Sequence, residues 1–339
     1  MNNQTHKFYI SRLLPTFIVV FFGFFVVAGV FGATRNPVAD FDGDGKSDIS
    51  VFRPSNGFWY IAKSSGGFLF VPWGISTDTP VPGDYDGDGR TDLAVFRRGP
   101  LVNSSSAVSN TWHILRSSDD TFLSIPYVAN SAWWWYYEAI PADYDADGKT
   151  DLAFYRRSDA IGETTRFMVL QSATNSESSR QLGNNGIDNA VPADYDGDGR
   201  TDFAIYRRGK WSIIESSNGT VRTEFFGLVN DVFVPGDYDG DGRSEIAVWR
   251  PTNGYWYWIS SRDKSFNSIQ FGMSGDKPTP ADYDGDGKTD IAVFRPATGV
   301  WYLLQSTQGF AAQQFGLAGD VPIPNVFVRS LFSIDYPGY

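Results

Sequence analysis

Asp84-Tyr85-Asp86-Gly87-Asp88-Gly89-Arg90-Thr91-Asp92 is one of six nine-residue loops of the same form in the 339-residue chain, and the segments around it repeat with it. The other five copies begin at Asp40, Asp143, Asp194, Asp237 and Asp282. Successive first aspartates are 44, 59, 51, 43 and 45 residues apart, a period typical of propeller blades. We number the residues of each loop 1 to 9.

Acidic side chains stand at positions 1, 3, 5 and 9, and carboxylates this close repel one another unless a cation lies among them. Calcium fits best, because it accepts six to eight oxygen ligands in loose geometry. Gly89 permits the turn that brings the carbonyl of Arg90 towards the ion. Position 12 is apolar, as at Val95, so the loop is not an EF-hand. A turn that is merely rich in Asp and Gly is the alternative, and six aligned copies argue against it.

Composition agrees with a folded, non-helical protein, since 35 Gly and 18 Pro interrupt the chain too often for long helices. The loops hold 24 of the 39 acidic residues, so the net charge of −11 is a property of the metal loops. It does not indicate a basic partner, and we expect no nucleic-acid partner. Cysteine is absent, and His113 is the only histidine outside the N-terminal leader, which leaves little for acid–base catalysis.

The first 33 residues read as an export signal, with Lys7 and Arg12 before an apolar run from Leu13 to Ala33. Cleavage is expected after Gly32. The run is also long enough to stay as an uncleaved membrane anchor. Either outcome places the remaining chain outside the cytoplasm, secreted or at the cell surface.

Each repeat contains four strand-like segments, which in the second unit are Pro80 to Tyr85, Asp92 to Arg97, Thr111 to Arg116 and Thr121 to Tyr127. The second segment is apolar on both faces, a pattern typical of strands buried between two sheets. An aromatic residue recurs in the third segment, and we interpret it as core between blades rather than a ligand platform. The aromatics are Trp59-Tyr60, Trp112, Phe167, Trp211, Trp256-Tyr257 and Trp301-Tyr302.

From Pro37 to about Gly319 the units resemble the FG-GAP/VCBS repeats of integrin-type calcium-binding β-propellers, with Phe271-Gly272 and Phe315-Gly316 as the Phe-Gly pairs. The resemblance implies one calcium per loop, about six in all, bound by side chains at positions 1, 3, 5 and 9 and the carbonyl at position 7. These residues are Asp40, Asp42, Asp44, Lys46 and Asp48; Asp84, Asp86, Asp88, Arg90 and Asp92; Asp143, Asp145, Asp147, Lys149 and Asp151; Asp194, Asp196, Asp198, Arg200 and Asp202; Asp237, Asp239, Asp241, Arg243 and Glu245; and Asp282, Asp284, Asp286, Lys288 and Asp290. Ala146 at position 4 and Glu245 at position 9 depart from the pattern, and we expect both to weaken their sites slightly.

We therefore predict an all-β fold, with residues 34–339 forming a single propeller of six four-stranded blades. The segment 320–339 resembles the start of a unit without its loop. It is expected to close the ring by adding a strand, and a rudimentary seventh blade is the alternative.

Strand direction places the acidic loops and the turns between strands three and four on one face, and the remaining connections on the other. The irregular features fall on that second face, where units two and three have long loops, Gly99 to Asn110 and Asp159 to Thr165. We predict a ligand-binding patch there, with packing of the aromatics against the two loops as the alternative. The patch consists of Trp133, Trp134, Trp135, Tyr136, Tyr137, Arg97, Arg98, Arg156 and Arg157.

An arginine ends the second strand of every unit, and an aspartate on the same face precedes a proline by four residues in five units. Pairing of these residues between blades is the favoured interpretation, and a polyanion-binding face is the alternative. The doubled arginines Arg98, Arg157 and Arg208 are not explained by that pairing.

The sequence thus predicts a calcium-binding, non-catalytic binding or adhesion module for a carbohydrate or an extracellular protein. Similar propellers include polysaccharide lyases and dehydratases, so an enzyme of that type is one alternative. A purely structural surface protein is another. We find no nucleophile with a general base beside it in the sequence pattern, and we predict no catalytic residues.

Overall fold

The computed structural model describes residues 38–99, 108–129, 135–158, 165–183 and 188–323, all of which lie in the compact unit of residues 33–339. Their regular structure is entirely β: six antiparallel sheets of four strands each. No helix among these residues has the length and apolarity needed to cross a membrane. The predicted leader lies outside the described residues.

The strands are numbered in chain order, and the blades follow the order of the loops. Blade 1 contains β24 (Val321–Pro322), β1 (Ile49–Arg53), β2 (Phe58–Ala62) and β3 (Phe68–Pro72); blade 2 contains β4 (Thr79–Pro80), β5 (Leu93–Arg97), β6 (Val108–Leu115) and β7 (Phe122–Ala129); and blade 3 contains β8 (Trp135–Ala139), β9 (Leu152–Ser158), β10 (Arg166–Leu170) and β11 (Glu177–Gln181). Blade 4 contains β12 (Asn189–Ala190), β13 (Phe203–Arg207), β14 (Lys210–Ile214) and β15 (Val221–Phe225); blade 5 contains β16 (Val232–Phe233), β17 (Ile246–Arg250), β18 (Tyr255–Ile259) and β19 (Phe266–Gln270); and blade 6 contains β20 (Lys277–Pro278), β21 (Ile291–Arg295), β22 (Val300–Gln305) and β23 (Gly309–Gln314).

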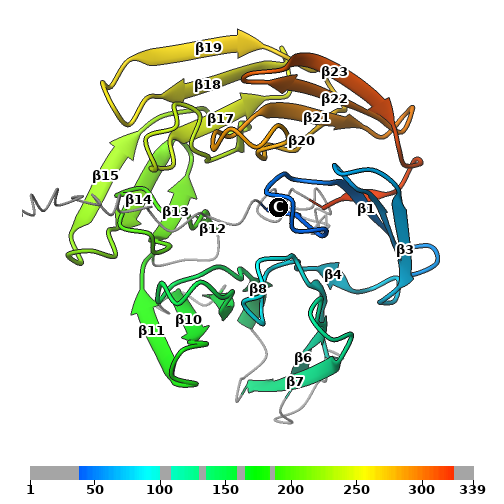
Figure 1. The fold of residues 1–339 in the computed structure, drawn as a ribbon. Coiled ribbons are helices and arrows are strands. Elements are labelled where there is room, and N and C mark those ends of the chain that lie inside the picture. Colours follow the sequence, from blue (N-terminus) through cyan, green and yellow to red (C-terminus); the bar gives the residue numbers. More distant parts are fainter. Residues whose placement is uncertain (1–37, 100–107, 130–134, 159–164, 184–187, 324–339) are drawn as a thin grey trace, which may run out of the picture. The chain divides into compact units, whose positions relative to one another are not determined.

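The six-bladed propeller predicted from the sequence is confirmed. Figure 1 shows the sheets arranged around a centre, with the short first strands inward and strands such as β3, β15 and β19 at the periphery. Strand β24, from the C-terminal segment, pairs with β1 through Val51↔Pro322 and Phe52↔Val321. The two ends of the repeat array therefore share blade 1, and this pairing closes the ring.

The innermost strand of blade 2 is shorter than predicted. The expected strand from Pro80 to Tyr85 is wrong, because β4 covers only Thr79–Pro80. Val81 still donates its N–H to the Ala94 carbonyl at 2.8 Å, but Pro82 has no N–H to continue the ladder. The chain leaves the sheet there, and after one isolated bridge between Gly83 and Asp92 it enters the acidic loop.

The core lies between neighbouring blades, as the buried second strands predicted. Strands β1, β5, β17 and β21 each bury four consecutive residues. Six hydrophobic clusters each join one blade to the next, and one of them packs Trp301 and Phe294 of blade 6 against Val51 of blade 1. The predicted core role of the recurrent third-strand aromatics is confirmed for Trp59, Trp112, Phe167, Trp211, Trp256 and Trp301, which are at most 1% exposed.

Blade 2 departs from the repeat at the end of its sheet away from the loop. Its strands β6 and β7 have eight residues each, whereas β2 and β3 of blade 1 have five. The predicted loop from Gly99 to Asn110 is therefore too long at its C-terminal end, because the strand begins at Val108 and pairs with Ala129. Residues 100–107 and 159–164 of the two predicted loops lie outside the described part of the chain.

Candidate functional site

The acidic loops are shaped by hydrogen bonds from their own backbone to their aspartates. In blade 2, Asp84 at position 1 accepts the N–H groups of Gly87 at 2.6 Å and Gly89 at 2.9 Å. Asp88 at position 5 accepts the N–H of Arg90 at 2.8 Å. Gly87 and Gly89 have φ of +81° and +87°, a conformation that glycine adopts without strain. The same bonds recur in the other loops, so the aspartates at positions 1 and 5 fix the backbone that presents the cluster.

The carboxylates of the loop converge on one point in blades 1 to 5. One oxygen from each of Asp84, Asp86 and Asp92 lies within 4.8 Å of the others, and positions 1, 3 and 9 make the same group in blades 1, 3 and 4. In blade 5 position 5 joins them, so four carboxylates form the group. The structure thus brings together the predicted side-chain ligands at positions 1, 3 and 9, whereas position 5 stays outside the group in blades 1 to 4. Such acidic groups could bind metal ions.

A second layer of donors comes from the turn between strands three and four. Ser117 donates its N–H to Asp92 at 2.6 Å and its hydroxyl to Asp88 at 3.0 Å, and the hydroxyl of Ser118 reaches Asp86 at 2.6 Å. The predicted placement of these turns beside the loops is therefore correct. Sequence reasoning missed their function as donors, although a Ser pair after the third strand was a visible signal. The corresponding donors are Ser64 and Ser65, Ser172, Ser216 and Ser217, Ser260 and Ser261, and Ser306 and Thr307.

Burial makes the ionised form of these acids unfavourable. It raises the pKa at position 9 to about 6 for Asp48, Asp92, Asp151, Asp202 and Asp290, despite hydrogen bonds that act in the opposite direction. The pKa of Glu245 rises to about 7 for the same reason. All the donors to these groups are neutral, so a cation would relieve the cost of holding the carboxylates charged.

One oxygen indicates that the groups suit a cation. Asp284, at position 3 of blade 6, is 7% exposed, and its Oδ2 accepts the Thr307 hydroxyl and two backbone N–H groups. Its Oδ1 is buried and has no hydrogen-bond partner among the described residues. A buried carboxylate oxygen without a donor is costly, and a metal ion would satisfy it.

The six loops are also joined to one another. The N–H at position 8 of each loop donates to the position-1 carbonyl of the preceding loop at 2.7 or 2.8 Å, and the bond from Ser47 to Asp282 completes the circle. The position-7 side chain covers the position-4 glycine of the preceding loop; a Cβ at Gly43 would lie 3.0 Å from Cγ of Arg90. Ala146 occupies this place in blade 3 with a φ of +62°, so it bears the backbone strain that glycine avoids.

Comparison with known families identifies the repeat. The FG-GAP-like repeat family matches residues 40–95 and 237–293. The chain is a propeller of FG-GAP-like repeats. The first matched segment runs from the loop of blade 1 into the second strand of blade 2, and the second runs from the loop of blade 5 into the second strand of blade 6. No curated protein sequence matches the chain.

Solved propellers resemble the FG-GAP-like propeller only distantly. An Agrocybe aegerita lectin that recognises non-reducing terminal N-acetylglucosamine is 13% identical, with a TM-score of 0.48 and coverage of 84% of this chain and 92% of the lectin. The N-terminal domain of BBS1 in complex with ARL6 is 13% identical, with a TM-score of 0.47 and coverage of 85% and 84%. A streptogramin B lyase is 11% identical, with a TM-score of 0.47 and coverage of 84% and 85%. At these values the likeness does not bear on function.

In five blades the strand-two arginine of the FG-GAP-like repeat forms an ion pair at the end of the strand away from the loop. Arg97 binds Asp78 through two hydrogen bonds of 2.8 Å, and Asp78 directly precedes β4 of the same sheet. The prediction of pairing between blades is therefore wrong: each aspartate pairs with the arginine of the blade whose first strand it begins. The other pairs are Arg53–Asp320, Arg207–Asp188, Arg250–Asp231 and Arg295–Asp276.

The predicted ligand patch is only partly on the surface. Tyr137 is buried in the core beside Phe154, and Arg157 is buried with an ion pair to Glu138 at 3.0 Å. In blade 3, Tyr137 occupies the position of the paired aspartate in the other blades. The ion pair of this blade uses the next residue on each strand, Glu138 and Arg157. Arg97 is engaged with Asp78, Arg156 is partly buried, and Arg98 is exposed. Trp133 and Trp134 lie outside the described residues, as do the side chains of Trp135 and Tyr136.

Proposed function

We propose that this FG-GAP-like propeller binds calcium in its six loops and acts as a non-catalytic binding module outside the cytoplasm. The observation that carries the metal assignment is the group of carboxylate oxygens within 4.8 Å of one another at positions 1, 3 and 9. These oxygens come from three separate points of one short loop, and the turn hydroxyls hold position 3 in place.

Calcium is the ion that this donor set suits. The group offers oxygen ligands only, from the carboxylates at positions 1, 3 and 9 and, in blade 5, position 5, and hard cations prefer such ligands. We propose that the remaining position-5 carboxylates and the position-7 carbonyls complete the set. When bound, the ion supplies positive charge that neutralises the buried carboxylates. Outside the cytoplasm, free calcium is abundant enough to fill sites of about 10⁻⁴–10⁻³ M affinity.

The binding role is proposed for the ends of blades 2 and 3 away from the loops. There β6 and β7 extend beyond the length of the other blades, and Arg98 is exposed. The predicted aromatic run, Trp133 to Tyr137, overlaps the start of β8, which is the first strand of blade 3. Because aromatic faces stack on sugar rings and arginine pairs with acidic groups, the proposed ligand is an anionic glycan or an acidic protein segment.

Two measurements test the proposal separately. Calorimetric titration of the chelator-treated protein should show calcium binding at several sites per chain, and an absence of binding heat and of any rise in melting temperature would reject the metal assignment. Glycan-array binding, with a lyase assay on acidic polysaccharides beside it, tests the binding role.

The matched variants for the array are a triple Trp133→Ala, Trp134→Ala, Trp135→Ala protein and Phe225→Ala in blade 4, which removes an aromatic side chain that is 78% exposed. Loss of binding in the triple variant alone, with an unchanged melting temperature, supports the proposed surface. Turnover of a polysaccharide would favour the lyase alternative.

A further inference from the structure

Blade 5 differs from the other blades at the second residue of the turn that supports its loop. Ser65, Ser118, Ser217 and Thr307 occupy this place in four blades, and each donates its hydroxyl to the position-3 carboxylate at 2.5 or 2.6 Å. Blade 3 has Ala173, whose backbone N–H makes the contact. Blade 5 has Arg262 instead.

The hydroxyl contact is kept in blade 5, but from another residue. Ser260, two positions earlier, donates to Asp239 Oδ2 at 2.6 Å. The corresponding residues of the other blades are Lys63, Arg116, Gln171, Glu215 and Gln305, none of which has a hydroxyl group. Arg262 is therefore not needed to hold Asp239, and its side chain is available for another interaction.

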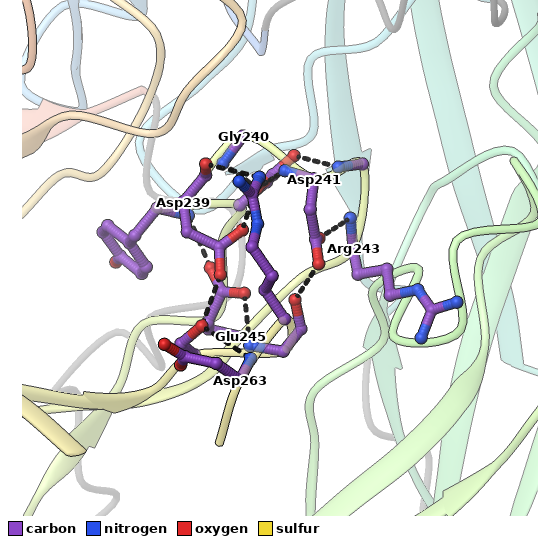
Figure 2. A network of polar contacts seen from close by, with 12 residues as sticks. Asp239, Gly240, Asp241, Arg243, Glu245 and Asp263 are labelled. Carbon is purple, nitrogen blue, oxygen red and sulfur yellow. Dashed lines mark hydrogen bonds and ion pairs between the residues drawn. The ribbon is translucent and has the colours of Figure 1, made fainter. Parts of the chain in front are cut away.

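Arg262 directs its guanidinium to the loop. Its Nη2 donates to the Asp239 carbonyl at 3.1 Å and lies 3.7 Å from Asp239 Oδ1. That Oδ1 is buried and accepts no hydrogen bond from the described residues. Figure 2 shows Asp239, Asp241 and Glu245 facing one another in the same network. A positive group thus stands beside the carboxylate oxygen that a bound ion would use.

We propose that Arg262 supplies part of the counter-charge of the blade-5 loop, so that this loop is the weakest calcium site of the six. The inference rests on the proposed calcium function. A guanidinium and a divalent ion that share one carboxylate repel each other, and the arginine already lowers the negative potential that attracts the ion. Because the side chain of Arg262 is 60% exposed, solvent screens the repulsion, and we expect the penalty to be about tenfold in affinity.

The charge and the hydroxyl can be separated by two variants. Arg262→Gln removes the charge and keeps most of the length, whereas Arg262→Ser restores the residue found in blades 1, 2 and 4. Both should tighten the weakest calcium step about tenfold in calorimetric titration. Equilibrium dialysis with metal analysis, at a free calcium concentration that leaves the weakest site empty, should then show one additional ion per chain.

Two further variants assign the effect to its blade. Asp239→Asn should remove the weakest step from the wild-type titration and leave the tighter steps intact. The reciprocal change Ser65→Arg, in blade 1, should create a second weak site. Melting temperatures in saturating calcium show whether each variant is folded.

Three results would overturn the inference: Arg262→Gln without effect on any step, Asp239→Asn removing a tight step, or Ser65→Arg leaving the blade-1 site unchanged in a folded protein. These failures differ from failure of the proposed function, in which no loop would bind calcium in any variant.

Discussion

The two ends of each second strand bury acidic side chains in opposite ways. At the loop end of β5, Asp92 is fully buried and accepts neutral donors, including the N–H groups of Tyr85 and Ser117. At the far end, Asp78 is 7% exposed and binds the guanidinium of Arg97 with both oxygens. The protein therefore supplies its own cation at one end. At the other end it holds carboxylates close together, in groups that could bind a metal ion.

The Arg–Asp pairs stabilise the fold in any solution, whereas stabilisation by the acidic loops would depend on the concentration of a metal ion. An Arg–Asp pair is complete whenever the chain folds. An acidic loop that binds an ion makes folding depend on the concentration of that ion, because the ion binds the native state alone. The predictions below test this division, beginning with the largest expected effect.

Removal of calcium should have the largest effect. Six sites each filled at about ten times their dissociation constant together stabilise the fold by several kcal/mol, so chelation should lower the melting temperature by on the order of 10–20 °C. Differential scanning calorimetry in excess chelator measures the shift, and metal analysis confirms that the sites are empty. An unchanged melting curve with empty sites would show that the loop carboxylates need no metal ion, just as the aspartates paired with arginine need none.

The pH dependence should be opposite for the empty and the loaded protein. Burial raises the pKa of Asp92 and Asp290 to about 6 in the native state, above the unfolded value, so the metal-free native state binds more protons than the unfolded chain between these values. The stability contributed by these groups is present at about pH 4 and is lost as the pH rises through about 6.

The melting temperature of the metal-free protein should therefore fall between about pH 4 and pH 7, by on the order of 10 °C for the six position-9 acids together. In saturating calcium the protein should instead lose stability as the pH falls, because protons displace the ion. Melting temperatures that change with pH in the same direction with and without calcium would contradict this prediction.

Paired variants in blade 6 compare the two ends directly. Asp276→Asn removes the partner of Arg295 and should cost about 2–3 kcal/mol whether or not calcium is present, because the pair is internal. Asp284→Asn, at position 3 of the same blade's loop, should reduce stability more in calcium than without it. Without calcium some loss remains, because the hydrogen bonds from Thr307 and Gln308 that lower the pKa of Asp284 weaken when the acceptor is a neutral amide. Chemical denaturation with and without calcium measures both, and an equal loss of stability in the two conditions for Asp284→Asn would contradict the metal role.

The smallest effect is expected for the second layer. Ser118→Ala deletes the hydroxyl that holds Asp86, and we expect the affinity of one site to fall about threefold, since a single hydrogen bond contributes about 1 kcal/mol or less. Thr121→Ala is the matched control, because its hydroxyl binds Asp119 in the same turn and no loop residue. Equal titrations for the two variants would show that the turn hydroxyl does not tune the site.

The sequence by itself determined the repeat and its chemistry. Six acidic loops at blade-like spacing, second strands apolar on both faces and one recurrent aromatic specify six blades packed face to face, because each feature is local and follows from strand periodicity. The acidic positions within each loop were also predictable, since Asp and Gly spacing fixes a short turn directly. The predicted first strand of blade 2 was wrong, because Pro82 has no N–H to continue the pairing.

Only the tertiary structure decided which residues meet across the chain. The turn hydroxyls reach position-3 carboxylates 21 to 32 residues away, and the Arg–Asp pairs join residues 19 apart, or 267 apart for Arg53 and Asp320 where the ring closes. The circle of bonds between loops needs all six blades in place. The burial of Tyr137 and Arg157 depends on a one-residue shift of the ion pair in blade 3. Such contacts depend on register and on the approach of neighbouring sheets, which a pattern within one segment does not encode.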